Sequence, residues 1–99
     1  MDIRTLQAQI AEAFAARDRA RGMDGTFRRL VEEVGEVAKA LRAGDRGALA
    51  LELSDLVAWT VSLAVLGGVD LDAALARYAA GCPRCGTSPC RCPADFAPS

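Results

Sequence analysis

The strongest constraint on this chain is a pair of carboxylates inside a long apolar segment. Residues 48–66 read ALALELSDLVAWTVSLAVL, in which Glu52 and Asp55 are the only charged side chains. Residues three apart on an α-helix lie on one face, so the two carboxylates point the same way. A carboxylate on such a helix is costly unless it is paired, hydrogen-bonded or bound to a metal. The segment therefore predicts a buried helix with a functional pair of charges.

A second carboxylate pair with the same spacing precedes the first. Glu33 and Glu36 lie in the segment LVEEVGEVAKAL, residues 30–41. Pairs on two consecutive helices can converge into a cluster of oxygen ligands, which suits hard cations such as Mg²⁺ and hence bound phosphates. The alternatives are a solvated acidic face and ion pairs with the cations Arg28, Arg29 and Lys39. Metal coordination is favoured because packing does not require carboxylates in the apolar segment.

Composition narrows the class of protein. Ninety-nine residues suffice for one small domain, and an apolar fraction of 52% with only 5% aromatic residues favours helices over sheets. A net charge of −1 with scattered arginines argues against a nucleic-acid partner. The chain has no histidine, so histidine catalysis and histidine metal ligation are excluded.

The location of the protein follows from the same segment and from the N-terminus. The first residues, MDIRTLQAQIAEAF, are too polar for a secretory signal. Residues 48–66 are long enough to cross a bilayer, but Glu52 and Asp55 would each cost about 3 kcal/mol there. We therefore expect a cytoplasmic protein with no membrane partner.

Apolar periodicity predicts an all-α fold whose first two helices are separated by glycines. The first begins at the cap Asp2 and ends before the run 22–25. The second begins at the cap Thr26. Its predicted core stripe consists of Phe27, Leu30, Val31, Val34, Ala38 and Leu41.

Two further helices complete the predicted four-helix domain, residues 1–81. The third begins at the cap Asp45 and ends at residues 67–68, and the fourth opens at Asp70. The apolar residues of the fourth helix are Leu71, Ala74, Leu75 and Tyr78. Residues 82–99 have no apolar periodicity and form a separate cysteine-rich tail.

The carboxylates match a known pattern. Glu32-Glu33-x-x-Glu36 followed by Glu52-x-x-Asp55 resembles the EExxE…ExxD signature of the MazG-like, all-α nucleoside triphosphate pyrophosphohydrolases. The resemblance runs from about residue 30 to residue 78, and it includes the segments GEVAKAL, ELSDLVAW and GVDLDAAL.

The resemblance implies a MazG-like helical bundle that forms dimers, or tetramers from dimers. It implies Mg²⁺-dependent cleavage of a (deoxy)nucleoside triphosphate to the monophosphate and pyrophosphate, with Mn²⁺ as an alternative metal. The implied metal ligands are Glu33, Glu36, Glu52 and Asp55. Glu32 would support a ligand or act as the base that orients the attacking water.

Three residues, Trp59, Arg77 and Tyr78, are candidates for substrate binding. Related dCTP-hydrolysing enzymes carry an aromatic residue at the place of Trp59, next to the nucleotide, although a core tryptophan is the alternative. Family members often carry a lysine and an asparagine on the last helix. Here the nearest residues are Arg77, Tyr78 and Cys82, and Arg77 could replace the lysine.

The tail contains all four cysteines. Cys82-Pro-Arg-Cys85-Gly is a turn of the kind that presents two thiolates to one zinc ion, and Cys90-x-Cys92 supplies two more. Four thiolates without histidine favour structural Zn²⁺. The alternatives are two disulfides in one of three pairings, a disordered tail, and a redox role in which Arg84 lowers a thiol pKa.

The sequence thus favours a metal-dependent nucleotide hydrolase. A non-catalytic nucleotide sensor is one alternative, because the last helix departs from the family pattern. An interaction module with a zinc-bearing tail and a purely structural acidic cluster is the other.

Overall fold

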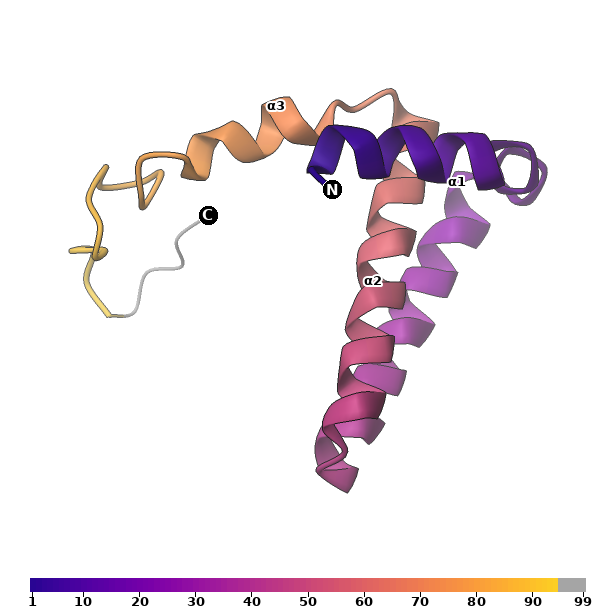
Figure 1. Ribbon diagram of the computed structural model, residues 1–99, viewed down its shortest axis with the longest axis horizontal. Coiled ribbons are helices and arrows are strands. Elements are labelled where there is room, and N and C mark those ends of the chain that lie inside the picture. Colours follow the sequence, from indigo (N-terminus) through magenta and orange to yellow (C-terminus); the bar gives the residue numbers. More distant parts are fainter. Residues whose placement is uncertain (95–99) are drawn as a thin grey trace.

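The computed structural model describes residues 1–94 and is helical throughout (Figure 1). Its elements are α1 (Ile3–Ala43), α2 (Arg46–Gly67), α3 (Leu71–Leu75) and the 3₁₀ turn η1 (Ala76–Tyr78). Residues 1–94 contain no β-strand, so the all-α prediction is confirmed. The predicted tail extends to residue 99, and its last residues, 95–99, lie outside the described part of the chain.

A sharp bend at Gly22 divides α1 into two helical segments. The backbone of Gly22 has φ 85° and ψ 167°, a conformation open almost only to glycine. Segment 3–21 crosses one end of α2, and segment 23–43 runs beside α2 in the opposite direction (Figure 1). The break expected over residues 22–25 is therefore a kink at one residue.

Thr26 does not cap a second helix, and that prediction was wrong. It lies inside α1 with 0% exposure, and its hydroxyl accepts a hydrogen bond from Arg21 Nη1 at 3.2 Å. The helix restarts directly after Gly22, so the backbone N–H groups near Thr26 already have helical partners and need no cap.

Three aspartates cap the helices as the sequence predicted. The side chains of Asp2, Asp45 and Asp70 accept hydrogen bonds from the backbone N–H groups three residues on, at 2.7, 3.0 and 3.2 Å. Each satisfies a donor that the first turn leaves unpaired. Helices α1 and α2 end with Gly44 and Gly68 as C-caps.

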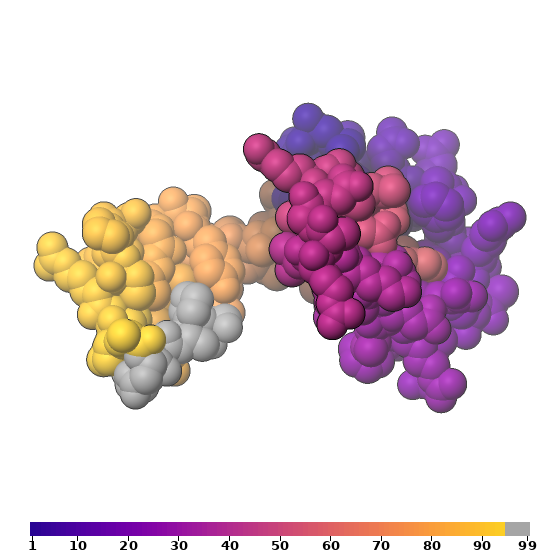
Figure 2. Space-filling view, turned by 90° about the horizontal axis from the view of Figure 1, so that it is seen from below, coloured from indigo at the N-terminus to yellow at the C-terminus, as the bar shows by residue number. Residues whose placement is uncertain are grey.

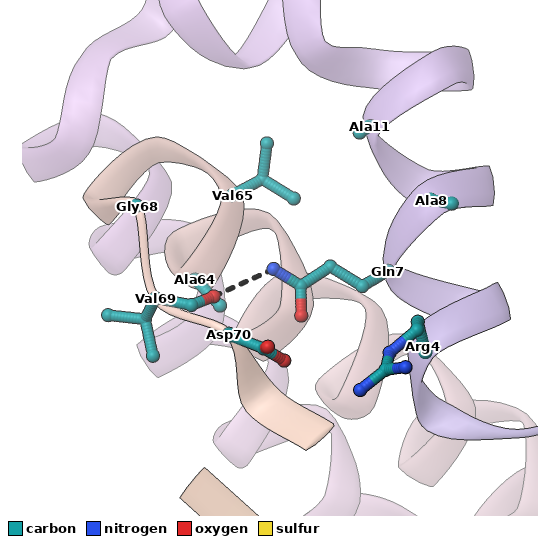
Figure 3. Close-up of a pocket in the computed structure, with 9 residues that line it drawn as sticks. All are labelled: Arg4, Gln7, Ala8, Ala11, Ala64, Val65, Gly68, Val69 and Asp70. Carbon is teal, nitrogen blue, oxygen red and sulfur yellow. Dashed lines mark hydrogen bonds between the residues drawn. The ribbon is translucent and has the colours of Figure 1, made fainter. Parts of the chain in front are cut away.

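The fourth helix is shorter than the apolar pattern predicted. Only Leu71–Leu75 is α-helical, and η1 continues it for three residues. Gln7 of α1 holds its start, because its side-chain amide donates to Val69 O at 2.7 Å (Figure 3). The same amide accepts a hydrogen bond from Leu71 N at 3.0 Å. Since neither α3 nor η1 contains a buried residue, no core favours further turns.

The buried apolar core is small. Outside the tail it consists of Ile10, Ala40, Val61 and Ala64. The predicted core stripe on α1 is largely exposed, at 51–62% for its members Phe27, Val31, Val34 and Leu41. Segment 23–43 faces α2 instead with the partly or fully buried residues Leu30, Glu33, Val37 and Ala40. The four exposed residues are called the apolar stripe below.

Helix α2 is long and apolar enough to cross a membrane by length and composition alone. Only 17% of its most apolar stretch is buried within this chain. A single helix of this kind is weak grounds for a membrane span, because the core helix of a soluble protein passes the same test.

Candidate functional site

Three of the four predicted metal ligands converge between α1 and α2. Glu33 lies on the face of α1 that packs against α2, and Glu52 and Asp55 lie one turn apart on α2. One carboxylate oxygen from each lies within 4.8 Å of the others. We call these three residues the acidic cluster. The packing of the two helices brings Glu33 to Glu52 and Asp55, which follow it by 19 and 22 residues in the sequence.

The acidic cluster is electrostatically strained without a cation. Burial, hydrogen bonding with Glu52 and the charges of Glu52, Asp55 and Glu36 raise the pKa of Glu33 from 4.5 to about 7. Its Oε1 atom is buried and has no hydrogen-bond partner. A buried, unpaired oxygen among like charges is a position that a divalent cation would stabilise. The residues present therefore fit a hard cation with oxygen ligands.

The other two acidic residues of the first motif lie beside the cluster. Glu36 Oε1 lies 3.6 Å from Lys39 Nζ, and Glu32 Oε2 lies 3.4 Å from Arg29 Nη1. Both side chains are at least half exposed. Glu36 is close enough for its charge to act on Glu33. The roles of Glu36 as a ligand and of Glu32 as a base remain predictions.

A cavity of about 410 Å³ adjoins the acidic cluster. Its lining contains Glu33, Asp55 and Trp59, so two of the four predicted metal ligands share one space with the predicted nucleotide-binding aromatic residue. The other lining residues are Phe14, Arg17, Asp18, Arg21, Ala58 and Ser62. We call this space the site cavity. It combines carboxylates, guanidinium groups and an aromatic ring.

An ion pair on α1 reaches the site cavity, and sequence reasoning missed it. Asp18 is 2% exposed, and its Oδ1 accepts a hydrogen bond from Arg21 Nη1 at 2.9 Å. The Arg21 guanidinium also lies over the ring of Trp59, 4.9 Å from its centre. The second carboxylate oxygen of Asp18 is buried without a hydrogen-bond partner. The only signal in the sequence was the i,i+3 spacing, which is common on solvated helices.

The two candidates on the last helix lie elsewhere. Arg77 and Tyr78 belong to η1, where the Arg77 guanidinium lies 5.5 Å from the centre of the Tyr78 ring. Both are exposed, and neither lines the site cavity in the described chain. Their role in substrate binding remains a prediction.

A second cavity, of about 480 Å³, lies between segment 3–21 and the end of α2 (Figure 3). It lacks the acidic cluster, and its polar groups are already engaged. Gln7 is bonded to backbone atoms, and Arg4 forms a 2.8 Å ion pair with Asp72. This cavity belongs to the packing of α1 against the end of α2 and the connection that follows it.

The four cysteines also converge. One Sγ atom from each of Cys82, Cys85, Cys90 and Cys92 lies within 4.8 Å of the others, and all four are free thiols. We call them the cysteine cluster. Figures 1 and 2 show the tail beyond α3, away from α1 and α2. Hydrogen bonding with Thr87 and with the backbone N–H of Arg91 lowers the pKa of Cys85 to about 5.

Comparisons with known proteins agree with the geometry. A family model described as the MazG nucleotide pyrophosphohydrolase domain matches residues 21–82. This range includes the whole acidic cluster and Trp59, and it ends at the first cysteine of the tail. No curated protein matches the chain. Because the matched range covers more than half of the sequence, this chain belongs to the MazG nucleotide pyrophosphohydrolase family.

Proposed function

We propose that this protein hydrolyses a (deoxy)nucleoside triphosphate at the α-phosphorus, releasing the monophosphate and pyrophosphate, with Mg²⁺ as its metal. The observation that carries the proposal is that Trp59 lines one cavity with Glu33 and Asp55, two of the three residues of the acidic cluster. A nucleoside triphosphate needs a bound cation at its phosphates and a surface on which its base can stack. The carboxylates and the Trp59 ring of this cavity would supply the cation site and the stacking surface.

The acidic cluster would hold the metal. When bound, Mg²⁺ would neutralise negative charge on the phosphates and lower the pKa of a water molecule that it coordinates. Glu33, Glu52 and Asp55 each offer one oxygen to the same small volume. The partner-less Oε1 of Glu33 is the atom that gains most from a cation, because it has no other compensation. Glu36 would be the fourth metal ligand. Glu32, one turn before it on the same helix, would orient the attacking water.

Two arginines could bind the phosphates in place of Arg77, which does not line the site cavity. Arg17 and Arg21 both line the site cavity, opposite in charge to the acidic cluster. Asp18 fixes Arg21 at the cavity wall, whereas Arg17 is exposed. A guanidinium binds phosphate oxygens through paired N–H donors. We therefore assign phosphate contacts to Arg17 and Arg21.

Trp59 would bind the nucleobase. It is partly exposed in the site cavity, and it lies one turn beyond Asp55 on α2. An accessible indole ring offers a face for stacking a base of any identity. This position is consistent with a nucleotide that spans from the acidic cluster to the ring.

The same proposal includes a homodimer, with a tetramer formed from two dimers as an alternative. The apolar stripe, Phe27, Val31, Val34 and Leu41, runs along α1 at 51–62% exposure. The Cα radius of gyration, 15.7 Å, exceeds the roughly 13 Å expected for a compact 100-residue domain. A second copy packed on the stripe would remove this apolar surface from water.

Release of pyrophosphate from a panel of standard and damaged triphosphates tests the activity. We expect Mg²⁺-dependent release that Asp55→Asn lowers by about 100-fold or more, since even the partners of metal ligands are worth about 10- to 100-fold. Asp24→Asn is the matched control, because that carboxylate is exposed and belongs neither to the acidic cluster nor to the lining of the site cavity. Metal-dependent nucleotide binding without release would indicate a sensor. Absence of both would indicate an interaction module.

A further inference from the structure

The tail contains a second set of metal-ligating side chains that the nucleotide site does not use. The family match ends at residue 82, so three of the four cysteines lie beyond it. None of the four lines the site cavity. The cysteine cluster is therefore spatially distinct from the site cavity.

The spacing of the sulfur atoms fits one tetrahedral ion. Sγ of Cys82 lies 3.8 Å from Sγ of Cys92, and Sγ of Cys85 lies 3.9 Å from Sγ of Cys90. Zinc–sulfur bonds of about 2.3 Å in a tetrahedron place the sulfurs about 3.8 Å apart. In a disulfide the two sulfur atoms would lie about 2.05 Å apart. The thiols are therefore arranged as ligands around a common centre rather than as two bonded pairs.

Backbone N–H groups support three of the four sulfurs. The N–H groups of Arg84, Arg91 and Cys92 donate to Sγ of Cys82, Cys85 and Cys90 at 3.4, 3.3 and 3.3 Å. Such donors stabilise thiolate charge, which a zinc ion with four thiolates carries in excess. These backbone N–H groups would therefore stabilise the negative charge of the zinc-bound thiolates.

The turn around Cys82 depends on a glycine. Gly86 N donates to Cys82 O at 2.7 Å, and Cys82 N donates to Thr87 O at 2.9 Å, which closes a tight loop. At Gly81, with φ 114°, a Cβ atom would lie 2.7 Å from Thr87 O. Only glycine allows this approach, so residues 81–87 are shaped to present Cys82 and Cys85 together.

Nothing apolar would order this segment by itself. Cys82 is the one buried residue of the described tail, 82–94. A segment of this length without a core needs a cross-link or a metal to hold a single conformation. Four soft thiolates without histidine select zinc over the hard cations that suit the acidic cluster.

We propose that Cys82, Cys85, Cys90 and Cys92 bind one zinc ion in a closed structural site, which makes the tail a separate zinc knuckle beside the nucleotide-binding domain.

The test is metal analysis of the full chain, purified under reducing conditions, followed by Co²⁺ titration of the metal-free protein. We expect about one zinc per chain and, with Co²⁺, the visible absorption of a tetrahedral thiolate complex. Cys90→Ser should weaken Co²⁺ binding by about tenfold or more. Two controls should retain the absorption: Arg91→Ala, which keeps the backbone donor, and Asp55→Asn, which alters only the acidic cluster.

Three outcomes would overturn the proposal. Four free thiols with no thiolate absorption would show that the cluster does not bind metal. In a second preparation made without reductant, free thiols that are absent in denaturant would show two disulfides. Metal binding that Asp55→Asn abolishes and Cys90→Ser leaves intact would place the ion in the acidic cluster. None of these outcomes bears on pyrophosphate release, so this proposal and the proposed function can fail independently.

Discussion

The guanidinium of Arg21 lies 4.9 Å from the centre of the Trp59 ring, and this contact joins the kink of α1 to the middle of α2. Arg21 is held there by Asp18 and Thr26, which are almost fully buried. One cation therefore connects the bend of the first helix to the aromatic wall of the site cavity. The stability of the kink and the environment of the only tryptophan are coupled through it.

Arg21→Met should destabilise the protein more than Asp18→Asn. Loss of Arg21 leaves a buried carboxylate without a counter-charge, which costs about 3 kcal/mol. Loss of the Asp18 charge leaves a cation whose side chain is 27% exposed, so water replaces part of the interaction and the cost is about 1 kcal/mol. Urea unfolding measures the free-energy loss in each variant. Trp59 fluorescence should shift in Arg21→Met and in Asp18→Asn.

Arg28→Met is the matched control for that comparison. Arg28 forms a 3.5 Å pair with Asp24 in which both side chains are at least 76% exposed, so its removal should cost less than about 0.5 kcal/mol. Equal losses from Arg21→Met and Arg28→Met would contradict a stabilising role for the buried pair.

The stability of the metal-free protein should depend on pH through Glu33. Its pKa is about 7 in the folded chain against 4.5 as the ordinary value, so between these values the folded state binds more protons than the unfolded state. The free energy of unfolding therefore falls as pH rises through this interval. The contribution of Glu33 is fully present below pH 4.5 and is lost as pH passes through about 7.

Urea unfolding in chelator at about pH 5 and about pH 8 measures this dependence. Glu33→Gln should reduce the difference between the two conditions, and Glu12→Gln, at an exposed position, should leave it unchanged. In the wild type, saturating Mg²⁺ should restore stability at the higher pH, because the cation takes the place of the proton. An identical pH dependence in wild type and Glu33→Gln would rule out this account.

Two glycines of α1 should respond to alanine in opposite ways. Neither has an atom within 4 Å of an added Cβ, so only the backbone differs. Gly22→Ala forces a side chain onto φ 85° and should cost about 1–3 kcal/mol. Gly35→Ala, within the helix, should gain about 0.5–1 kcal/mol. Both values follow from urea unfolding, and a neutral Gly22→Ala would show that the kink is not a fixed feature in solution.

The apolar stripe predicts assembly in solution. Light scattering at micromolar concentration should report a dimer or a tetramer for the wild type. Val34→Glu should shift it toward monomer while circular dichroism retains the helical signal, because Val34 is half exposed within one chain. Ala13→Glu, at an exposed position on segment 3–21, should leave assembly unchanged. A wild type that is monomeric at this concentration would contradict the dimer.

Local rules within the sequence determined where the three α-helices begin and part of the site. The caps Asp2, Asp45 and Asp70 were predictable because a cap is a contact over three residues. The pairing of Glu52 with Asp55 was predictable because i,i+3 residues share a helix face in any fold. The converging thiols follow in the same way from a short segment dense in cysteine.

Only the tertiary structure decided which face of each helix is buried. Two faces of segment 23–43 carry apolar residues, and the prediction of a buried stripe from periodicity was wrong about which of them is buried. The kink at Gly22 and the position of α2 bury the face with Glu33 and Ala40, and they leave Phe27 and Val34 half exposed. The same packing brings Asp18 and Arg21 to Trp59. Helix periodicity specifies which residues share a face, but contact with another helix selects the face that is buried, and no local interaction contains that choice.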